Sequence, residues 1–106
     1  MNLTKLQIEV AEWSAKNFPN KQKHQPLLGV SEEVGELCHA HLKAEQGIRG
    51  MDIEHTMSKI DAIGDIVIYL ADYCEQNDID LSMAVSNTWE EVKKRDWTKN
   101  KKDGKV

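Results

Sequence analysis

Two aspartates, one helical turn apart, interrupt the most apolar segment of this chain. Residues 59–70 read Lys-Ile-Asp-Ala-Ile-Gly-Asp-Ile-Val-Ile-Tyr-Leu, so Asp61 and Asp65 stand among isoleucine, valine and leucine. At about 100° per residue, their carboxylates lie roughly 40° apart around a helix axis and project from one side. Aspartate is rarely buried in such a setting without a partner. The segment therefore predicts a packed helix whose acids meet a cation.

A second acidic group precedes this segment. Residues 29–37 read Gly-Val-Ser-Glu-Glu-Val-Gly-Glu-Leu, which places Glu32, Glu33 and Glu36 within two helical turns. Glu33 and Glu36 lie roughly 60° apart around their helix axis and also share one side. Two such helices packed face to face would gather four carboxylates, those of Glu33, Glu36, Asp61 and Asp65.

Such a cluster is costly without a metal ion. Like charges about 4 Å apart repel by about 4 kcal/mol per pair at an effective dielectric constant near 20. Ligand sets made only of carboxylate oxygens favour a hard ion, Mg²⁺ or Mn²⁺, over zinc or copper. Mg²⁺ in turn favours phosphate substrates, because it keeps coordination sites for water and phosphoryl oxygens. We therefore expect these four acids to bind Mg²⁺, with Mn²⁺ as a substitute.

The same residues carry a family resemblance. Glu-Glu-Val-Gly-Glu-Leu, followed after a spacer by Asp-Ala-Ile-Gly-Asp-Ile-Val-Ile-Tyr-Leu, resembles the MazG-like nucleotide pyrophosphohydrolases of the all-α NTP pyrophosphatase superfamily. The family pattern is Glu-x-x-Glu, a spacer, then Glu-x-x-Asp, and Glu33, Glu36 and Asp65 match it. One position departs, because Ala62 stands three residues before Asp65 and the acid is Asp61, four before it. Positions i−3 and i−4 share a helix face, so Asp61 is within reach of the same metal.

The resemblance implies Mg²⁺-dependent hydrolysis of a nucleoside triphosphate between its α- and β-phosphates, yielding a monophosphate and pyrophosphate. Glu32 is then free to orient or deprotonate the attacking water. Relatives place aromatic and cationic residues against the nucleotide, which implies substrate contacts for Trp13, Lys94 and Arg95. Competing interpretations make Trp13 a core aromatic and the two cations a solvated helix end. Precedented substrates include dUTP, dCTP, modified triphosphates and phosphoribosyl-ATP, and the sequence does not choose among them.

Apolar residues at spacings of three and four predict an all-α fold of four helices. We expect helices over 3–17, 26–45 and 81–96, and a third that begins between 52 and 58 and ends before a turn at 77–80. The predicted fold is a four-helix bundle with its metal-bearing pair antiparallel. The predicted inner faces are Leu3, Leu6, Val10 and Trp13; Leu27, Val30, Val34, Leu37 and His41; Ile60, Ile63, Val67, Leu70, Ala71 and Cys74; and Leu81, Ala84, Val85, Thr88 and Val92.

Chain length and charge limit the number of domains and the kinds of partner that we expect. With 106 residues the chain is one domain, predicted to span 1–97, followed by a basic tail at 98–106 that we expect to be mobile. A chain of this size buries only a little over 60% of its unfolded surface, which favours a homodimer or homotetramer. The formal charge is −4, but residues 1–92 hold sixteen acids against seven bases. This acidic body argues against a protein that coats nucleic acid.

Cysteine usage and hydropathy predict a cytoplasmic protein with no membrane partner. Cys38 and Cys74 fall in predicted helices without Cys-x-x-Cys spacing, so we expect two small buried residues in a reducing compartment. The N-terminus lacks the features of a signal peptide, and no apolar run reaches membrane-spanning length.

Two further interpretations stay open. One is a non-enzymatic helical dimerisation module whose acids only solubilise it. The other is a di-iron carboxylate bundle, because Glu36-Leu-Cys-His39 has the Glu-x-x-His ligand motif. That architecture needs the motif twice, and the nearest second copy, Asp52-Ile-Glu-His55, follows a glycine-containing loop at a helix start.

Overall fold

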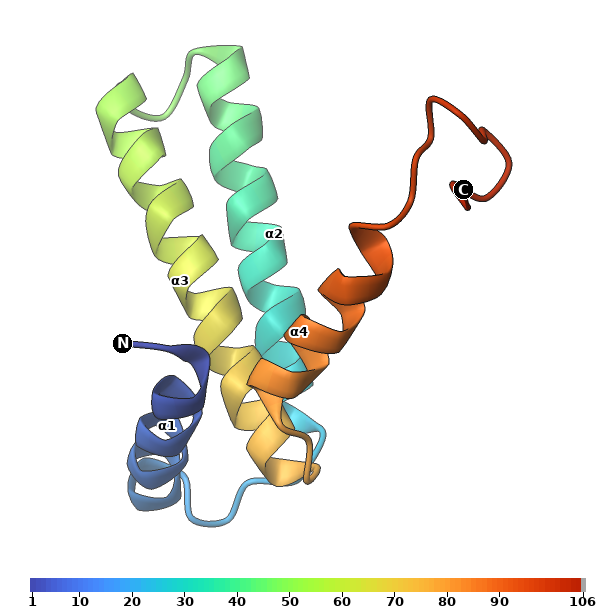
Figure 1. The fold of residues 1–106 in the computed structure, drawn as a ribbon. Helices are drawn as coiled ribbons and strands as arrows, with labels where there is room; N and C mark the ends of the chain where they lie inside the picture. The colour runs from blue at the N-terminus through green and yellow to red at the C-terminus, as the bar shows by residue number, and fades with distance from the viewer. Residues whose placement is uncertain (106) are drawn as a thin grey trace.

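The computed structural model describes residues 1–105, which form four helices and no strand. The helices are α1 (Leu3–Asn17), α2 (Gln25–Gln46), α3 (Asp52–Gln76) and α4 (Leu81–Val92) (Figure 1). The prediction of an all-α fold with four main helices is confirmed. Val106, the last residue of the predicted tail, lies outside the described residues.

Local side-chain chemistry sets most of the helix ends. Asn2 begins α1 by accepting a hydrogen bond from the Lys5 N–H at 2.8 Å, and Asp80 does the same for α4 with the Met83 N–H at 3.0 Å. Helix α2 ends on Gly47, whose left-handed φ of 68° suits a residue without a Cβ. The fourth helix is shorter than predicted, because regular α-helix ends at Val92 and turns follow.

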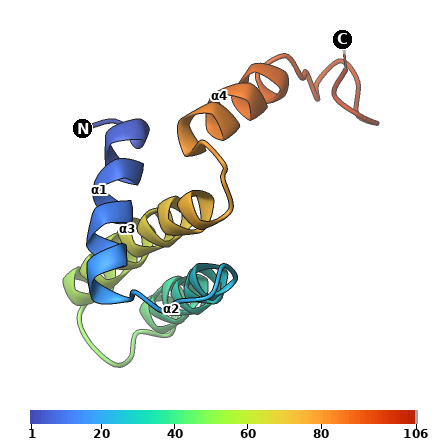
Figure 2. The ribbon, with the colours of Figure 1, turned by 90° about the horizontal axis from the view of Figure 1, so that it is seen from below.

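The helices are arranged as a hairpin with two flanking helices. Helices α2 and α3 lie antiparallel and contact each other along their length, while α1 lies against α3 (Figures 1 and 2). Helix α4 contacts α1 and α3, and no contact joins it to α2 in the described chain. The antiparallel pairing of the two acidic helices is therefore present, but the four helices do not close into a bundle within one chain.

The hydrophobic core lies where α1, α3 and the start of α4 meet. Its buried members are Val10, Ala71, Cys74 and Leu81, with Leu3 and Leu6 packed against them. The buried Gln7 side chain joins α1 to the α3–α4 connection and to the start of α4, since its Nε2 donates to the Ile79 carbonyl at 2.8 Å and its Oε1 accepts from the Leu81 N–H at 2.9 Å. These two bonds satisfy polar groups that burial would otherwise leave unpaired.

Much of the predicted inner surface is uncovered, which corrects the sequence analysis. On α2, Leu27 and Val34 remain 47% and 43% exposed, whereas Val30 and Leu37 are half-buried. The side that carries Glu33 faces α3. The physical reason is the packing of Gly29 directly against the Tyr69 ring, which leaves no room for a Cβ. Other apolar residues outside the core are Ile60, Ile63, Val85, Trp89 and Val92.

Two side chains differ from their predicted burial. Trp13 is 55% exposed rather than a core aromatic, and its ring meets Phe18 edge to face at 5.7 Å between centroids. Cys38 is exposed, so the prediction of two buried thiols is wrong for this residue, whereas Cys74 is buried as expected. Burial, with the nearby Asp80 charge, raises the pKa of the Cys74 thiol. None of the described helices is both long and apolar enough to span a membrane.

The residues that follow α4 turn back on themselves. The Asp96 N–H donates to the Gly104 carbonyl at 2.6 Å, and Gly104 is buried against Arg95 and Trp97. A hydrogen bond from the Thr98 hydroxyl lowers the pKa of the Asp96 carboxyl. The domain boundary at residue 97 and the mobility of the tail stay predictions.

Candidate functional site

The five acids singled out in the sequence line one pocket between α2 and α3, which we name the acidic pocket. It has a volume of about 460 Å³ and receives three carboxylates from α2 and two from α3. These are Glu32, Glu33, Glu36, Asp61 and Asp65. Ala62, the position at which the MazG-like pattern has an acid, also lines this pocket and is almost fully buried. The departure from the pattern therefore lies within the site itself.

The carboxylates of the acidic pocket are close enough to affect one another. Partial burial, followed by the charges of Asp65, Glu32, Glu36 and Asp61, raises the pKa of Glu33. No lysine, arginine or histidine within residues 1–105 lies within 4.0 Å of any of these carboxylates. The protein thus holds a negative cluster that its own cations do not neutralise.

The donor set suits a hard cation, although the side chains are not yet gathered around one point. As they stand, no three acidic, histidine or cysteine side chains among residues 1–105 are grouped closely enough to hold a metal ion. Glu32, Glu36 and Asp61 are exposed, and exposed side chains change rotamer on the picosecond to nanosecond timescale. Carboxylate oxygens are the ligands that Mg²⁺ and Mn²⁺ prefer. The chemistry of the donors therefore suits such an ion, and metal binding by these residues stays a prediction.

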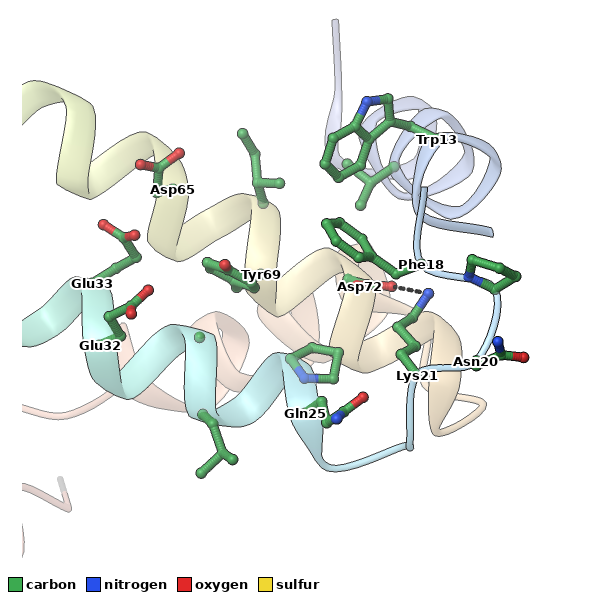
Figure 3. A pocket seen from close by; sticks show the side chains of 16 residues that line it. Trp13, Phe18, Asn20, Lys21, Gln25, Glu32, Glu33, Asp65, Tyr69 and Asp72 are labelled. Carbon is green, nitrogen blue, oxygen red and sulfur yellow. Dashed lines mark ion pairs between the residues drawn. The ribbon is translucent and has the colours of Figure 1, made fainter. Parts of the chain in front are cut away.

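A second, larger pocket adjoins the first, and we name it the aromatic pocket. It has a volume of about 740 Å³ and lies between α1, the start of α2 and the end of α3. Trp13, Phe18 and Tyr69 line it (Figure 3). The sequence analysis named only Trp13 as a candidate substrate contact, which stays a prediction, and missed the other two rings. Burial and then the charges of Glu32 and Glu33, the largest of several acidic charges, raise the pKa of the Tyr69 hydroxyl. The negative charges of the acidic pocket therefore also act on Tyr69, a residue of the aromatic pocket.

The two pockets are adjacent and share three lining residues. Glu32, Glu33 and Asp65 line both, and Figure 3 shows Glu33 and Asp65 facing each other from opposite helices. The remaining α2 residues of the aromatic pocket precede Glu32 in sequence, and those of the acidic pocket follow Glu33. Along the hairpin, the aromatic pocket therefore lies on one side of the shared acids and the rest of the acidic pocket on the other.

A buried polar network forms one wall of the aromatic pocket. The Ser14 hydroxyl donates to Asp72 Oδ2 at 2.9 Å, and Lys21 Nζ donates to Ser14 Oγ at 2.6 Å. Lys21 Nζ also lies 3.3 Å from Asp72 Oδ1, an ion pair whose geometry does not make a hydrogen bond (Figure 3). This network ties the α1–α2 connection to α3. The sequence analysis gave Asp72 no role, although a third acid in an apolar helix was a signal.

The predicted cationic residues lie elsewhere in the single chain. Lys94 and Arg95 follow α4, are exposed and line neither pocket. Lys94 Nζ lies 3.9 Å from a Glu91 oxygen, and the Arg95 Cβ lies beside Gly104. The structure therefore does not bring these two cations to the acids, and their contact with substrate stays a prediction.

No protein-family model matches the chain, and no curated protein or solved structure is significantly similar to it. The geometry of the two pockets, together with the MazG-like motif, therefore carries the functional argument. The acidic pocket also contains His39, Arg49 and His55. The two histidines entered the sequence analysis only through the di-iron interpretation, and Arg49 was assigned no role there.

Proposed function

We propose that the protein is a Mg²⁺-dependent nucleoside triphosphate pyrophosphohydrolase that cleaves its substrate between the α- and β-phosphates. The observation that carries this proposal is that the aromatic and acidic pockets adjoin, with Glu32, Glu33 and Asp65 lining both. A nucleoside triphosphate joins a flat ring to a polyanion that is bound with a divalent cation. It therefore needs an aromatic wall next to a carboxylate cluster, and the MazG-like motif supplies that cluster.

In this proposal Glu33, Glu36 and Asp65, with Asp61, hold Mg²⁺ or Mn²⁺. When bound, the ion neutralises charge on the triphosphate. Water adds to one phosphorus of the α–β anhydride while the bridging P–O bond breaks, and Glu32 takes the proton released by the water. Glu32 suits this role because it lines both pockets and is exposed.

The nucleoside occupies the aromatic pocket. Trp13 and Phe18 come from the end of α1 and Tyr69 from α3, so a base between them contacts rings on two sides. Stacking of this kind contributes about 1–3 kcal/mol per base and tolerates different bases. Tyr69 lies four residues, about 6 Å, along α3 from Asp65. That spacing sets the base against the rings and the first phosphate against the acids.

Self-association as a homodimer or homotetramer is part of the proposal. Its support is the uncovered apolar surface of α2 and α4, which includes Leu27, Val34, Val85 and Trp89. Exposed apolar patches of this kind mark interaction surfaces in small proteins. In such an assembly the cationic end of α4 from one chain reaches the pocket of another, which gives Arg95 and Lys94 their phosphate contacts. The proposal includes a cytoplasmic location, which the cysteine usage of the sequence favours.

A screen of nucleoside triphosphates tests the proposal. The purified protein is incubated with each triphosphate in Mg²⁺, in Mn²⁺ or in EDTA, and pyrophosphate and monophosphate are measured. We expect equal amounts of both products from at least one triphosphate, and none in EDTA. Failure to release pyrophosphate from any triphosphate with either metal would overturn the proposal.

The uncovered apolar faces also favour a second candidate, a helical dimerisation module without enzymatic activity. Metal binding separates the two candidates, because a ligand that binds only the folded state raises the melting temperature by mass action. Millimolar Mg²⁺ should stabilise the proposed enzyme measurably and leave a plain module unchanged.

A further inference from the structure

Arg49 lies in the short loop between α2 and α3 and lines the acidic pocket. Its part of the pocket also contains His39, His55 and Ser58. Along the hairpin, the aromatic pocket comes first, then the shared acids, and then this loop. Arg49 and its neighbours therefore lie on the far side of the acids from the aromatic pocket. The acidic pocket thus has a cationic residue at the end opposite the aromatic rings.

Hydrogen bonds hold this loop on both sides of Arg49. The Ile48 N–H donates to the Lys43 carbonyl at 3.2 Å, and the buried His55 Nε2–H donates to the Ile48 carbonyl at 2.9 Å. On the other side, the Met51 N–H donates to Glu54 Oε1 at 3.0 Å. The backbone that carries Arg49 is therefore anchored to both helices of the hairpin.

The backbone of Arg49 is in a conformation that its side chain does not favour. Its φ of 64° is left-handed, which is uncommon for a residue with a long side chain and costs conformational energy. Gly47 and Gly50 beside it have positive φ without that cost. Strained residues of this kind cluster at binding and catalytic sites. A glycine would suit this turn better, so the presence of an arginine at position 49 indicates a role for its side chain.

The Arg49 guanidinium has no partner among the described residues. No carboxylate of residues 1–105 lies within 4.0 Å of it, and none of the hydrogen bonds found there involves its side chain. This holds although five carboxylates line the same pocket. Its five N–H donors are therefore free for an anion, and their planar fork matches two phosphoryl oxygens.

We propose that Arg49 binds the terminal phosphates of the triphosphate, at the end of the acidic pocket opposite the aromatic pocket. This inference rests on the proposed function and adds the direction in which the substrate lies. On α3, Asp65 and Ser58 are seven residues apart, about 10 Å along the helix axis. The phosphate chain runs along this interval from the shared acids toward Arg49. Arg49 is then the residue that holds the departing pyrophosphate.

Inorganic pyrophosphate tests this role without any turnover. Isothermal titration calorimetry measures the binding of pyrophosphate in saturating Mg²⁺, and of Mg²⁺ alone, to the wild type and to Arg49→Gly, Arg49→Lys and Lys59→Asn. Lys59 is a nearby cation that lines neither pocket, so it is the matched control for loss of charge. Glycine suits a left-handed φ, so Arg49→Gly should melt at or above the wild-type temperature, and any lost binding cannot be assigned to unfolding.

We expect Arg49→Gly to weaken Mg²⁺-pyrophosphate binding about tenfold or more and to change Mg²⁺ binding less than twofold. Arg49→Lys should recover part of the loss, because it restores the charge without the fork. Wild-type affinity for pyrophosphate in Arg49→Gly, an equal loss in Lys59→Asn, or no pyrophosphate binding by the wild type would each overturn the role of Arg49. A wild type that cleaves no triphosphate overturns the proposed function instead, and the pyrophosphate titration still decides on Arg49.

Discussion

The α2–α3 hairpin and the α4 segment differ in how their functional candidates are positioned. In the hairpin, two helices of one chain face each other along their length, and five acids predicted from the sequence meet in one pocket. Helix α4 is buried at Leu81, but Val85, Trp89 and Val92 stay exposed, and Lys94 and Arg95 after them line neither pocket. The chain thus places its carboxylates by itself, whereas any substrate contact of Lys94 and Arg95 depends on a second chain.

Neutralising a carboxylate of the hairpin should have the largest effect. We expect Glu36→Gln and Asp65→Asn each to lower kcat/KM by more than the roughly 10- to 100-fold that loss of an outer-shell partner costs a metal site. Circular dichroism should show intact helices, because the amide keeps the size of the acid. Asp61→Asn should cost as much only if Asp61 replaces the acid absent at Ala62. Near-normal activity of Glu36→Gln would contradict the assignment of the metal ligands. Glu45→Gln is the control, because Glu45 lies outside the pocket.

The next largest effect should come from charging the exposed face of α4. A buried tryptophan at the centre of an interface contributes about 2 kcal/mol or more, so Trp89→Asp should raise the dissociation constant of the oligomer at least about 30-fold. Sedimentation velocity at several protein concentrations measures this change. Asn87→Asp places the same charge on the opposite side of α4 and should leave assembly intact. Identical behaviour of the two variants would show that the Trp89 face is not the interface.

A smaller effect is expected from the cations after α4. Arg95→Ala should raise KM about five- to tenfold at low salt with little change in kcat, if the arginine binds ground state and transition state alike. A fall in kcat instead would mean that it contacts charge that develops during cleavage. Lys94→Ala should have the lesser effect of the two. If both variants keep wild-type kinetics, this segment is a solvated helix end and the hairpin alone makes the site.

The smallest effect concerns stability without metal. The raised pKa of Glu33 means that its folded-state contribution to stability is present below the ordinary value of 4.5 and is lost as pH rises through the folded pKa. Metal-free Glu33→Gln should therefore melt about 1–3 °C higher than the wild type at pH 7, and the difference should vanish near pH 4. Mg²⁺ should reverse the order, because it stabilises only the wild type fully. Glu9→Gln, on the exposed surface of α1, is the control.

The sequence predicted the structural features that depend on residues close to one another in the chain. Helix periodicity and caps such as Asp80 depend on neighbours within a few residues, and the acids of the hairpin were visible because they interrupt apolar segments. The inward face of α2 was predicted only in part, because Val30 and Leu37 are half-buried while Leu27, Val34 and His41 are exposed. The contact of Gly29 with the Tyr69 ring turns the face toward the side that carries Glu33. The Lys21–Asp72 pair spans 51 residues, and the left-handed backbone of Arg49 has no signature in side-chain pattern, so neither could be predicted from the sequence.

The contact between Gly29 and Tyr69 has a consequence for how this chain can vary. Any side chain at position 29 would overlap the Tyr69 ring, and that ring is a wall of the aromatic pocket. An alanine at 29 is therefore tolerated only if the ring swings away or a smaller residue replaces it. In a library randomised at both positions, we expect the two sites to covary, with a larger residue at 29 paired with a smaller one at 69. The residue at position 29 would then limit the size of the residue at position 69, and through it the bases that fit the aromatic pocket.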